Sequence, residues 1–154
     1  MLRHFPKGEM LVRQGEATMK VLVIRSGVVK CYITEDNDKE FILEFLGEGE
    51  VVGELEAIGR RPAMCNVQTL SEVAVYLIDK PTFLDLLGRH PALNAAVLEL
   101  MAVRLTNTAT RAARQQLHSL DYSLRQLLAV LEREKIPVTK QDLADFLVHF
   151  ITFA

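Results

Sequence analysis

The stretch VVGELEAIGRRPAMCNV runs from Val51 to Val67 and combines a Gly-Glu-Leu turn, one short spacer and two adjacent arginines. Gly49 and Gly53 bracket three residues, so we expect the chain to turn tightly twice. A short helix that begins near Gly53 would present free backbone N–H groups, which suit a phosphate. The run after the arginines is typical of a strand. The stretch therefore predicts a turn that can hold an anion beside a strand.

The charged residues of this stretch favour a ligand that carries both an anion and a hydroxyl group. Arg60 or Arg61 could make a charge-assisted, bidentate contact to a phosphate. Glu54 would repel that phosphate, but it could accept a hydrogen bond from a neighbouring sugar hydroxyl while it pairs partly with an arginine. The alternative is an ordinary turn with a solvated glutamate and arginines, and these residues alone leave both readings open.

Short β-rich runs flank this stretch and alternate with turn signals. They are VLVIR (21–25), VVKCYIT (28–34), FILEFL (41–46) and VAVYLI (73–78). The segment EDNDK (35–39) lies between two of them and is typical of a hairpin tip. Several short strands at regular spacing predict a sandwich or a barrel.

The distribution of glycine and proline changes after this β-rich half. All eight glycines lie at or before Gly88, and neither glycine nor proline occurs from Ala92 to Ile136, which indicates a switch to helices. Pro81 suits a helix start and Gly88 a helix end. One apolar stripe at helical spacing then follows Pro91: Leu93, Ala96, Val97, Leu100, Met101 and Leu105.

This stripe predicts a long helix that protrudes beyond its own domain. A helix of about 25 residues is about 37 Å long, which exceeds the width of a small barrel. The simplest cover for the protruding part is the same helix of a second subunit. The alternative is a helix that packs wholly on its own barrel.

Two further helical segments are expected near the C-terminus. Leucines in phase predict a helix over about 121–134. In VTKQDLADFL, Thr139 is a good N-cap and Asp142 lies three residues on, as in a capping box. We expect three regions, namely a β-rich domain (1–90), a long dimerisation helix (91–118) and a C-terminal segment (119–154).

The order of these motifs resembles one known family. FPKGEMLVRQGE, VIRSGVVKCYI, FILEFLGEGEVVGEL, RRPAMCNVQTLSEVAVYLI and the long helix resemble the cyclic-nucleotide-binding domain of CRP/FNR transcription regulators, from about Phe5 to Leu147. The resemblance implies an α+β fold: a double-stranded β-helix (a jelly-roll-like β-roll), then a long dimerisation helix and short C-terminal helices. VTKQDLADFL resembles the phrase that opens the family's helix-turn-helix.

The resemblance also implies a ligand-binding site for a cyclic nucleotide such as cAMP. Gly53, Glu54 and Leu55 match the phosphate-cassette turn, whose glutamate takes the ribose hydroxyl. Arg61 matches the arginine that pairs with the cyclic phosphate, but the spacer before it is short, so Arg60 could substitute.

Other positions of that pocket depart from the family pattern. Pro62 stands where many members have Ser or Ala, so one phosphate contact is missing. Thr108 matches a threonine that reaches the adenine amino group, whereas Ala109 replaces the partner subunit's base contact. Met64 and Cys65 are expected in the core. The implied site is thus largely present for phosphate and ribose and partly lost for the base.

The resemblance implies a bacterial, cytoplasmic sensor that passes an effector signal through its dimer helix to a DNA-binding domain. Alternatives are a stand-alone β-roll that binds no nucleotide, and a sensor of haem or another small molecule, although His4, His90, His118 and His149 are scattered. No enzyme motif and no metal-binding spacing occurs, so we expect neither catalysis nor a metal. The two cysteines are expected to be buried thiols.

Composition agrees with a soluble chain that is not strongly basic. The net charge is −2; residues 1–88 carry 10 basic and 14 acidic residues (−4), and residues 89–154 carry 8 and 6 (+2). The sequence has no apolar run long enough for a membrane span. Because VHFITFA (148–154) stands where the family has a glycine turn and a recognition helix, we expect DNA binding only in a full-length form.

Overall fold

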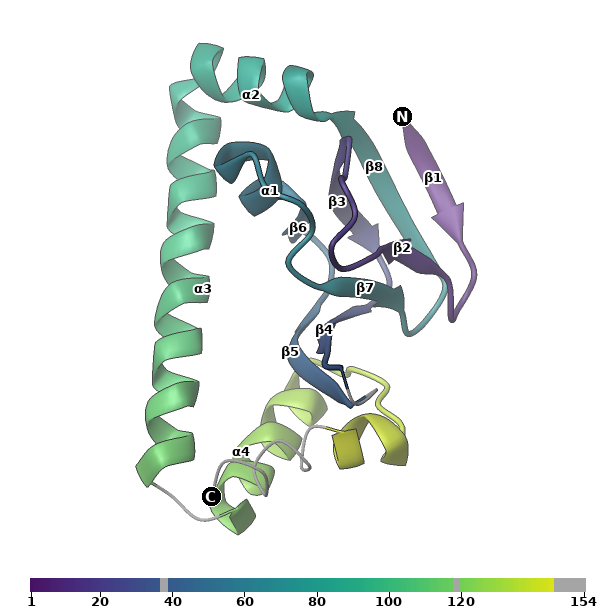
Figure 1. Cartoon of the computed structure of the whole chain (residues 1–154), viewed down its shortest axis with the longest axis vertical. Helices are drawn as coiled ribbons and strands as arrows, with labels where there is room; N and C mark the ends of the chain where they lie inside the picture. Colours follow the sequence, from purple (N-terminus) through teal and green to yellow (C-terminus); the bar gives the residue numbers. More distant parts are fainter. Residues whose placement is uncertain (37–38, 118–119, 146–154) are drawn as a thin grey trace.

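The computed structural model describes residues 1–36, 39–117 and 120–145 of the chain. Two four-stranded antiparallel sheets form a β-roll, and helices lie along one side of it and at both ends (Figure 1). This confirms the α+β fold class, with a β-roll, a long helix and short C-terminal helices. None of the helices in the described ranges carries an apolar stretch that could cross a membrane.

The first sheet has the strand order β1–β8–β3–β6, and the second has the order β2–β7–β4–β5. The strands are β1 (Leu2–Phe5), β2 (Met10–Val12), β3 (Lys20–Ser26), β4 (Val29–Thr34), β5 (Glu40–Leu46), β6 (Val51–Val52), β7 (Asn66–Thr69) and β8 (Val73–Asp79). Neighbours in the chain often lie in different sheets, which gives the roll its double-stranded character. The four longest strands match the four β-rich runs of the sequence.

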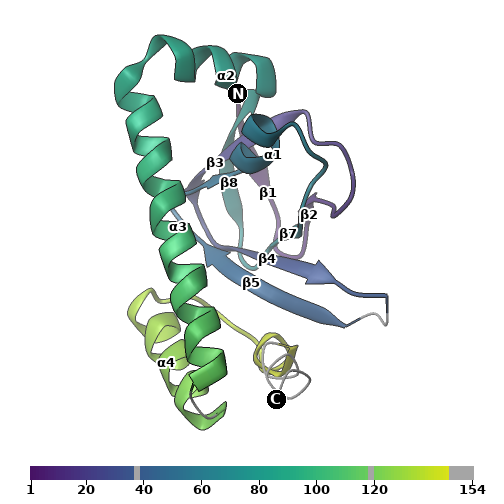
Figure 2. The same cartoon turned by 60° about the vertical axis from the view of Figure 1, so that its left-hand side comes forward.

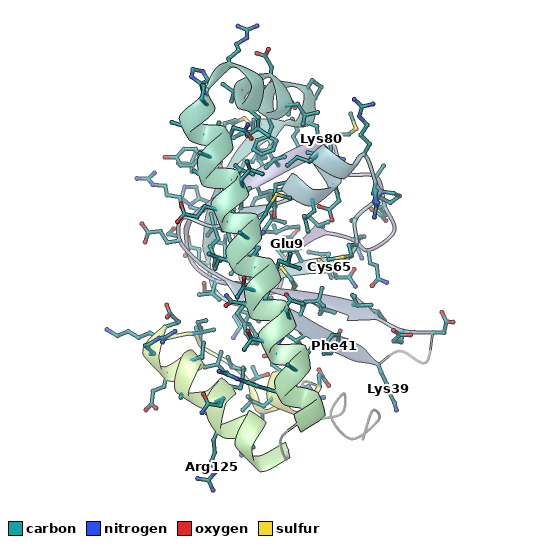
Figure 3. All side chains as sticks on the ribbon, turned by 90° about the vertical axis from the view of Figure 1, so that its left-hand side faces the viewer. Glu9, Lys39, Phe41, Cys65, Lys80 and Arg125 are labelled. Carbon is teal, nitrogen blue, oxygen red and sulfur yellow. The ribbon has the colours of Figure 1, made fainter. Side chains whose placement is uncertain are left out.

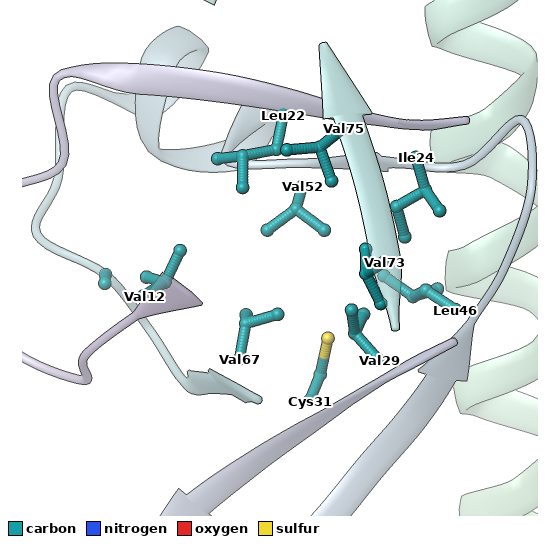
Figure 4. Close-up of a cluster of buried hydrophobic side chains, with 11 residues drawn as sticks. Val12, Leu22, Ile24, Val29, Cys31, Leu46, Val52, Val67, Val73 and Val75 are labelled. Atoms are coloured by element: carbon teal, nitrogen blue, oxygen red, sulfur yellow. The ribbon is translucent and has the colours of Figure 1, made fainter. Parts of the chain in front are cut away.

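The core lies between the two sheets and consists mostly of β-branched residues (Figure 4). Alternate side chains of each strand point to opposite faces, so every second residue of β3, β4 and β8 enters this core. Val29 and Cys31 of β4, Val73 and Val75 of β8 and Ile24 of β3 are all buried there. This packing fixes the positions of the strands that carry the site.

Strands β4 and β5 form a hairpin, as EDNDK predicts. Thr34 is paired with Glu40, and the Glu35 N–H donates to the Lys39 carbonyl at 3.0 Å. Positions 37 and 38 lie outside the described residues. Figure 2 shows the hairpin extending away from the body of the β-roll.

Helices follow the last strand almost without a break. They are α2 (Lys80–Arg89), α3 (Pro91–Leu117) and α4 (Leu120–Arg133), and a helical segment runs from Lys140 to Asp145. The expected start near Pro81 and the start at Pro91 agree with the structure. The expectation for Gly88 was wrong, because α2 continues through it and His90 is the C-cap.

Helix α3 divides its apolar residues between two faces. Val97 is buried against the roll, and Met101 packs beside it with Phe83 of α2. By contrast, Leu98 is 59% exposed and Leu105 is 71% exposed. The single stripe of the sequence is therefore two: one face holds the β-roll and another faces outward along the helix.

Candidate ligand-binding site

The turn before α1 (Glu54–Gly59) has a backbone that requires glycine. Gly53 has a φ of 90°, and a Cβ placed there would lie 2.9 Å from the Lys20 carbonyl oxygen. An L-residue is strained at this φ and would also collide with β3. Gly53 therefore lets α1 begin directly above the end of the β3–β6 pair, and it sets the position of Glu54.

Beside this turn lies a small cavity between the two sheets and α3. Its volume is about 50 Å³. Side chains from five strands (β2, β4, β5, β6 and β7), from α1 and from α3 line it. Those with polar or sulfur atoms are Cys31, Glu44, Glu54, Glu56, Met64, Cys65 and Arg104. Figure 3 shows α3 crossing the face of the roll in front of Cys65.

Glu54 and Arg104 form the polar centre of this cavity. Glu54 is 1% exposed, and its Oε1 accepts a hydrogen bond from Nη1 of Arg104, which comes from the middle of α3. Nη2 of Arg104 donates to the Val51 carbonyl at 2.6 Å. The guanidinium thus joins the long helix to both sides of the turn that the sequence singled out.

Burial dominates the electrostatics of Glu54. Desolvation raises the pKa of its carboxyl, and this effect exceeds the opposing attraction of Arg104. The cavity wall holds three carboxylates, those of Glu44, Glu54 and Glu56, against one guanidinium. Its formal balance is therefore negative, which does not by itself favour an anion.

One donor of Arg104 remains available. Its Nε is buried without a hydrogen-bond acceptor among the described residues, and Oε1 of Glu44 lies 3.8 Å from it. A buried N–H group without an acceptor is costly. A ligand that offers an acceptor at this point would relieve that cost.

The structure brings together only part of the site that the sequence predicts. Gly53, Glu54 and Leu55 line the cavity. Arg60, Arg61 and Pro62 are exposed and lie outside its lining, and so does Thr108 on α3.

The direction of the arginine pair has a backbone cause. Arg60 is the C-cap of α1 in a left-handed conformation, with φ 53°, and the Arg61 N–H donates to the Glu56 carbonyl. The Arg61 side chain lies back over the end of α1, with its Cδ 3.7 Å from the place of a Cβ on Gly59. The left-handed turn thus directs the pair away from the cavity in this conformation.

Sequence reasoning missed Arg104, although a signal was present. At 100° per residue, Arg104 shares a helix face with Val97 and Met101, and Arg111 continues that face. Arg111 donates to the Leu43 carbonyl, and burial lowers the pKa of its guanidinium. Two arginines in phase with buried apolar residues indicate side chains that reach into the domain.

The sulfur-containing side chains differ from expectation. Cys31 is buried, and a hydrogen bond with the Cys65 thiol, together with burial, raises its pKa well above the usual range. Cys65 is only half-buried and precedes β7, and Met64 is exposed, so the expectation of a core position was wrong for Met64. No group of His, Cys, Asp or Glu that could hold a metal occurs within residues 1–36, 39–117 and 120–145.

The two histidines that the structure describes do not line the cavity. His4 and His90 are exposed and outside its lining. His118 and His149 lie outside the described residues.

Comparison with known proteins places this geometry in a family. The family model described as "Cyclic nucleotide-binding domain" matches residues 2–90, more than half of the chain. The CRP-like cAMP-activated global transcriptional regulator of Mycobacterium tuberculosis is 26% identical over 104 residues, which are 68% of this chain and 46% of that protein. The chain therefore spans about half the length of that relative.

Longer similarities extend through the helices. The cAMP-activated global transcriptional regulator CRP of Salmonella typhimurium is 27% identical over 144 residues, 92% of this chain and 68% of that protein. The solved structure of CLP, the c-di-GMP-responsive global regulator of Xanthomonas campestris, superposes with a TM-score of 0.83 at 21% identity and covers 96% of this chain and 79% of that chain. With the glycine turn, the buried Glu54 and the long helix that closes the cavity, these matches show that the chain belongs to the cyclic nucleotide-binding domain family and is related to the CRP/FNR regulators.

Proposed function

We propose that this chain is the effector-sensing part of a CRP/FNR-type transcription regulator, and that its cavity receives a cyclic nucleotide such as cAMP or a similar small effector. The observation that carries the proposal is the buried Glu54–Arg104 pair, which links the cassette turn to α3 at the cavity. A carboxylate oxygen of Glu54 accepts a hydrogen bond from the ribose hydroxyl, and Gly53 and Leu55 keep the turn in place. The protein binds its effector without chemical conversion.

Binding requires the cavity to open. A volume of about 50 Å³ is far below the roughly 300–1,000 Å³ of ordinary ligand pockets. The ligand therefore separates Arg104 from Glu54, and Nε and Nη1 of Arg104 turn to its phosphate. When the connection after α1 moves, Arg61 contacts the same phosphate, and Arg60 is the alternative for this contact. Pro62 contributes no hydrogen-bond donor there. Thr108 reaches the base from α3.

The exposed outer face of α3 supports a dimer in this scheme. Leu98, Ala102, Leu105 and Ala109 recur at the spacing of a coiled-coil seam, and all four are exposed in the isolated chain. Because Arg104 lies on the same helix, an effector that moves it also moves the seam. The signal is thus a population shift of the dimer helices, which a DNA-binding domain of the full-length protein reads.

Isothermal titration of the purified protein with cAMP and cGMP tests this proposal, with adenosine as a probe that lacks the phosphate. We expect binding of a cyclic nucleotide that weakens about 10- to 100-fold in Glu54→Gln and in Arg104→Gln, since each loses a charge-assisted hydrogen bond. Arg61→Ala reports whether the outer arginine joins the phosphate. A cyclic nucleotide whose affinity is unchanged in all three variants would exclude this site.

A second function is favoured by the closed cavity and the outward arginines. In that case the β-roll serves as a dimerisation module, or it senses a different effector. The absence of any heat with cAMP or cGMP up to millimolar concentration, from a folded dimer, would support this alternative. A visible spectrum of the purified protein, recorded first, tests for haem.

A further inference from the structure

Lys30 is a buried cation on the outer face of the strand that lines the cavity. It is 7% exposed, while its neighbour Cys31 belongs to the cavity wall. Consecutive residues of a strand point to opposite faces, so β4 presents Cys31 inward and Lys30 outward. Its ammonium lies 4.8 Å from the centre of the Tyr32 ring, two residues along the same face.

The main partner of Lys30 comes from the far end of the chain. Its Nζ donates to Oδ1 of Asp142 at 3.0 Å, and Asp142 is 5% exposed. The two residues are separated by 112 positions in the sequence. A second carboxylate, Glu40 of β5, accepts from the same Nζ at 3.3 Å. Figures 1 and 2 both show the short helical segment before the C-terminus lying next to the β4–β5 hairpin.

Asp142 serves two structures at once through its two oxygens. Oδ2 accepts hydrogen bonds from the Thr139 backbone N–H at 3.1 Å and from its hydroxyl at 2.6 Å. The Asp142 N–H donates back to the Thr139 hydroxyl at 3.1 Å, which completes the capping box. The carboxylate that begins this helical segment is therefore the same one that anchors it on β4.

Apolar contacts accompany the ion pair. Tyr32 and Ile42 form a separate buried cluster on this face of the hairpin, and Leu127 of α4 packs against it. The α4 helix and the segment from Thr139 thus both dock on β4 and β5. The contact lies outside the core between the sheets, whose members are other residues.

We infer that the Lys30–Asp142 ion pair is a latch that holds the start of the C-terminal segment (139–145) on the outer face of the β4–β5 hairpin. In the latched state both charges are buried and paired. When the segment leaves the hairpin, both charges become solvated. Neither charge then stays buried without its partner, which would be costly. The chain therefore has a docked and an undocked arrangement of the segment that resembles the opening of a helix-turn-helix, and charge at Lys30 favours the docked one.

Such a latch is well placed for regulation, because β4 borders both the cavity and the ion pair. The inner face of β4 borders the cavity and the outer face carries the anchor, so the same two residues, Cys31 and Lys30, connect the two places. The inference goes beyond the proposed effector and is tested in the ligand-free protein. Its outcome is therefore independent of whether a cyclic nucleotide binds.

Hydrogen–deuterium exchange of the full chain, read by mass spectrometry, tests the latch. Lys30→Met keeps the apolar stem and removes the charge, and Asp142→Asn keeps a partner for the cap. We expect the backbone amides of 139–145 to exchange about tenfold faster or more in each variant, since local opening governs their rate. We expect unchanged rates in β3 and β8.

Two matched controls isolate the ion pair. Glu40→Gln removes the other partner of Lys30 and leaves Asp142 in place, so segment 139–145 stays protected. Lys20→Met removes a cation from an exposed pair with Asp79, where the side chains are 50% and 61% exposed, and it leaves the whole exchange pattern unchanged.

Two results would overturn the inference. Unchanged exchange of 139–145 in both Lys30→Met and Asp142→Asn would show that the pair does not hold the segment. Equal acceleration in 139–145 and in the β-roll core would show that the contact is part of the global fold and not a separable latch. Faster exchange restricted to 139–145 and α4 supports it.

Discussion

Single residues decide how the cassette turn is built. Gly53 is needed for its left-handed backbone and for its approach to β3, and Glu54 follows it into the cavity. The sequence indicated both residues because a Gly-Glu-Leu phrase is readable as a turn. It could not indicate the direction of Arg61, because that depends on the left-handed conformation of Arg60, which a non-glycine residue rarely adopts.

At Gly53 we predict that alanine destabilises the fold more than at a turn glycine with open surroundings, such as Gly49. Gly53→Ala combines left-handed strain with a 2.9 Å approach to the Lys20 carbonyl, and we expect the free energy of unfolding to fall by about 2–4 kcal/mol. Gly49→Ala is the matched control, because its φ of 83° is similar but no atom lies within 4 Å. We expect it to cost about 1 kcal/mol.

Urea denaturation followed by circular dichroism measures both glycine variants. The difference between them isolates the collision with β3 from the strain at φ. Equal losses of stability would mean that β3 moves aside freely, and the argument for the position of α1 would then fail.

At the scale of elements, the sequence predicts the long ones well. β3, β4, β5 and β8 have enough residues for their pattern to show, and α3 is marked by the absence of breakers. β6 has two residues and β2 has three, so neither can display a period. Their pairing comes from the roll as a whole, which the resemblance supplied and the periodicity did not.

The same limit explains the misreading of α3. A search for apolar residues merged its two faces into one stripe and left Arg104 unassigned. Burial separates them, because Val97 faces the roll and Leu105 faces outward. Long basic side chains can occupy a buried face when their ends find acceptors, as Arg104 and Arg111 do.

For α3 we predict that a charge on the outward face strongly weakens the proposed dimer. Leu105→Glu places a carboxylate in the seam, and we expect dimerisation to weaken roughly 100-fold or more because that charge would be buried unpaired. Val103→Glu is the control: Val103 is 51% exposed but lies about 140° around the helix from Leu98. Light scattering at several protein concentrations measures the dimerisation of both variants. A dimer that survives in Leu105→Glu, or is lost equally in Val103→Glu, would place the interface elsewhere.

At the scale of the whole molecule, two buried ion pairs of the described residues lie where helical segments meet the β-roll. Glu54 is paired with α3, and Lys30 is paired with the segment after α4. Neither pair includes a residue of the apolar core shown in Figure 4. The helical segments attach to the β-roll through charged contacts as well as apolar ones, and the charge of such contacts depends on pH.

The pH dependence of unfolding should reveal the attachment at Asp142. Burial alone would raise the pKa of this carboxyl, but hydrogen bonds from Thr139 and Lys30 outweigh burial and lower it. A carboxyl with a lowered pKa in the folded state contributes stability that is present above its unfolded value, about 3.9, and is lost as pH falls through the folded value. Asp142 contacts Lys30 and Thr139, and Lys30 in turn contacts Glu40 of β5 and the Tyr32 ring.

We therefore predict that Asp142→Asn is less stable than the natural chain by about 1–3 kcal/mol near neutral pH, and that this difference shrinks below about pH 4. Lys30 sets the limit of the stabilising pH range at high pH. Burial lowers its pKa, but Asp142 and Glu40 raise it more, so its contribution is lost only as pH rises through that raised value. Urea unfolding of both proteins from pH 3 to pH 8 measures the difference. A gap that stays constant through the acid range would show that Asp142 acts through its shape and not through its charge.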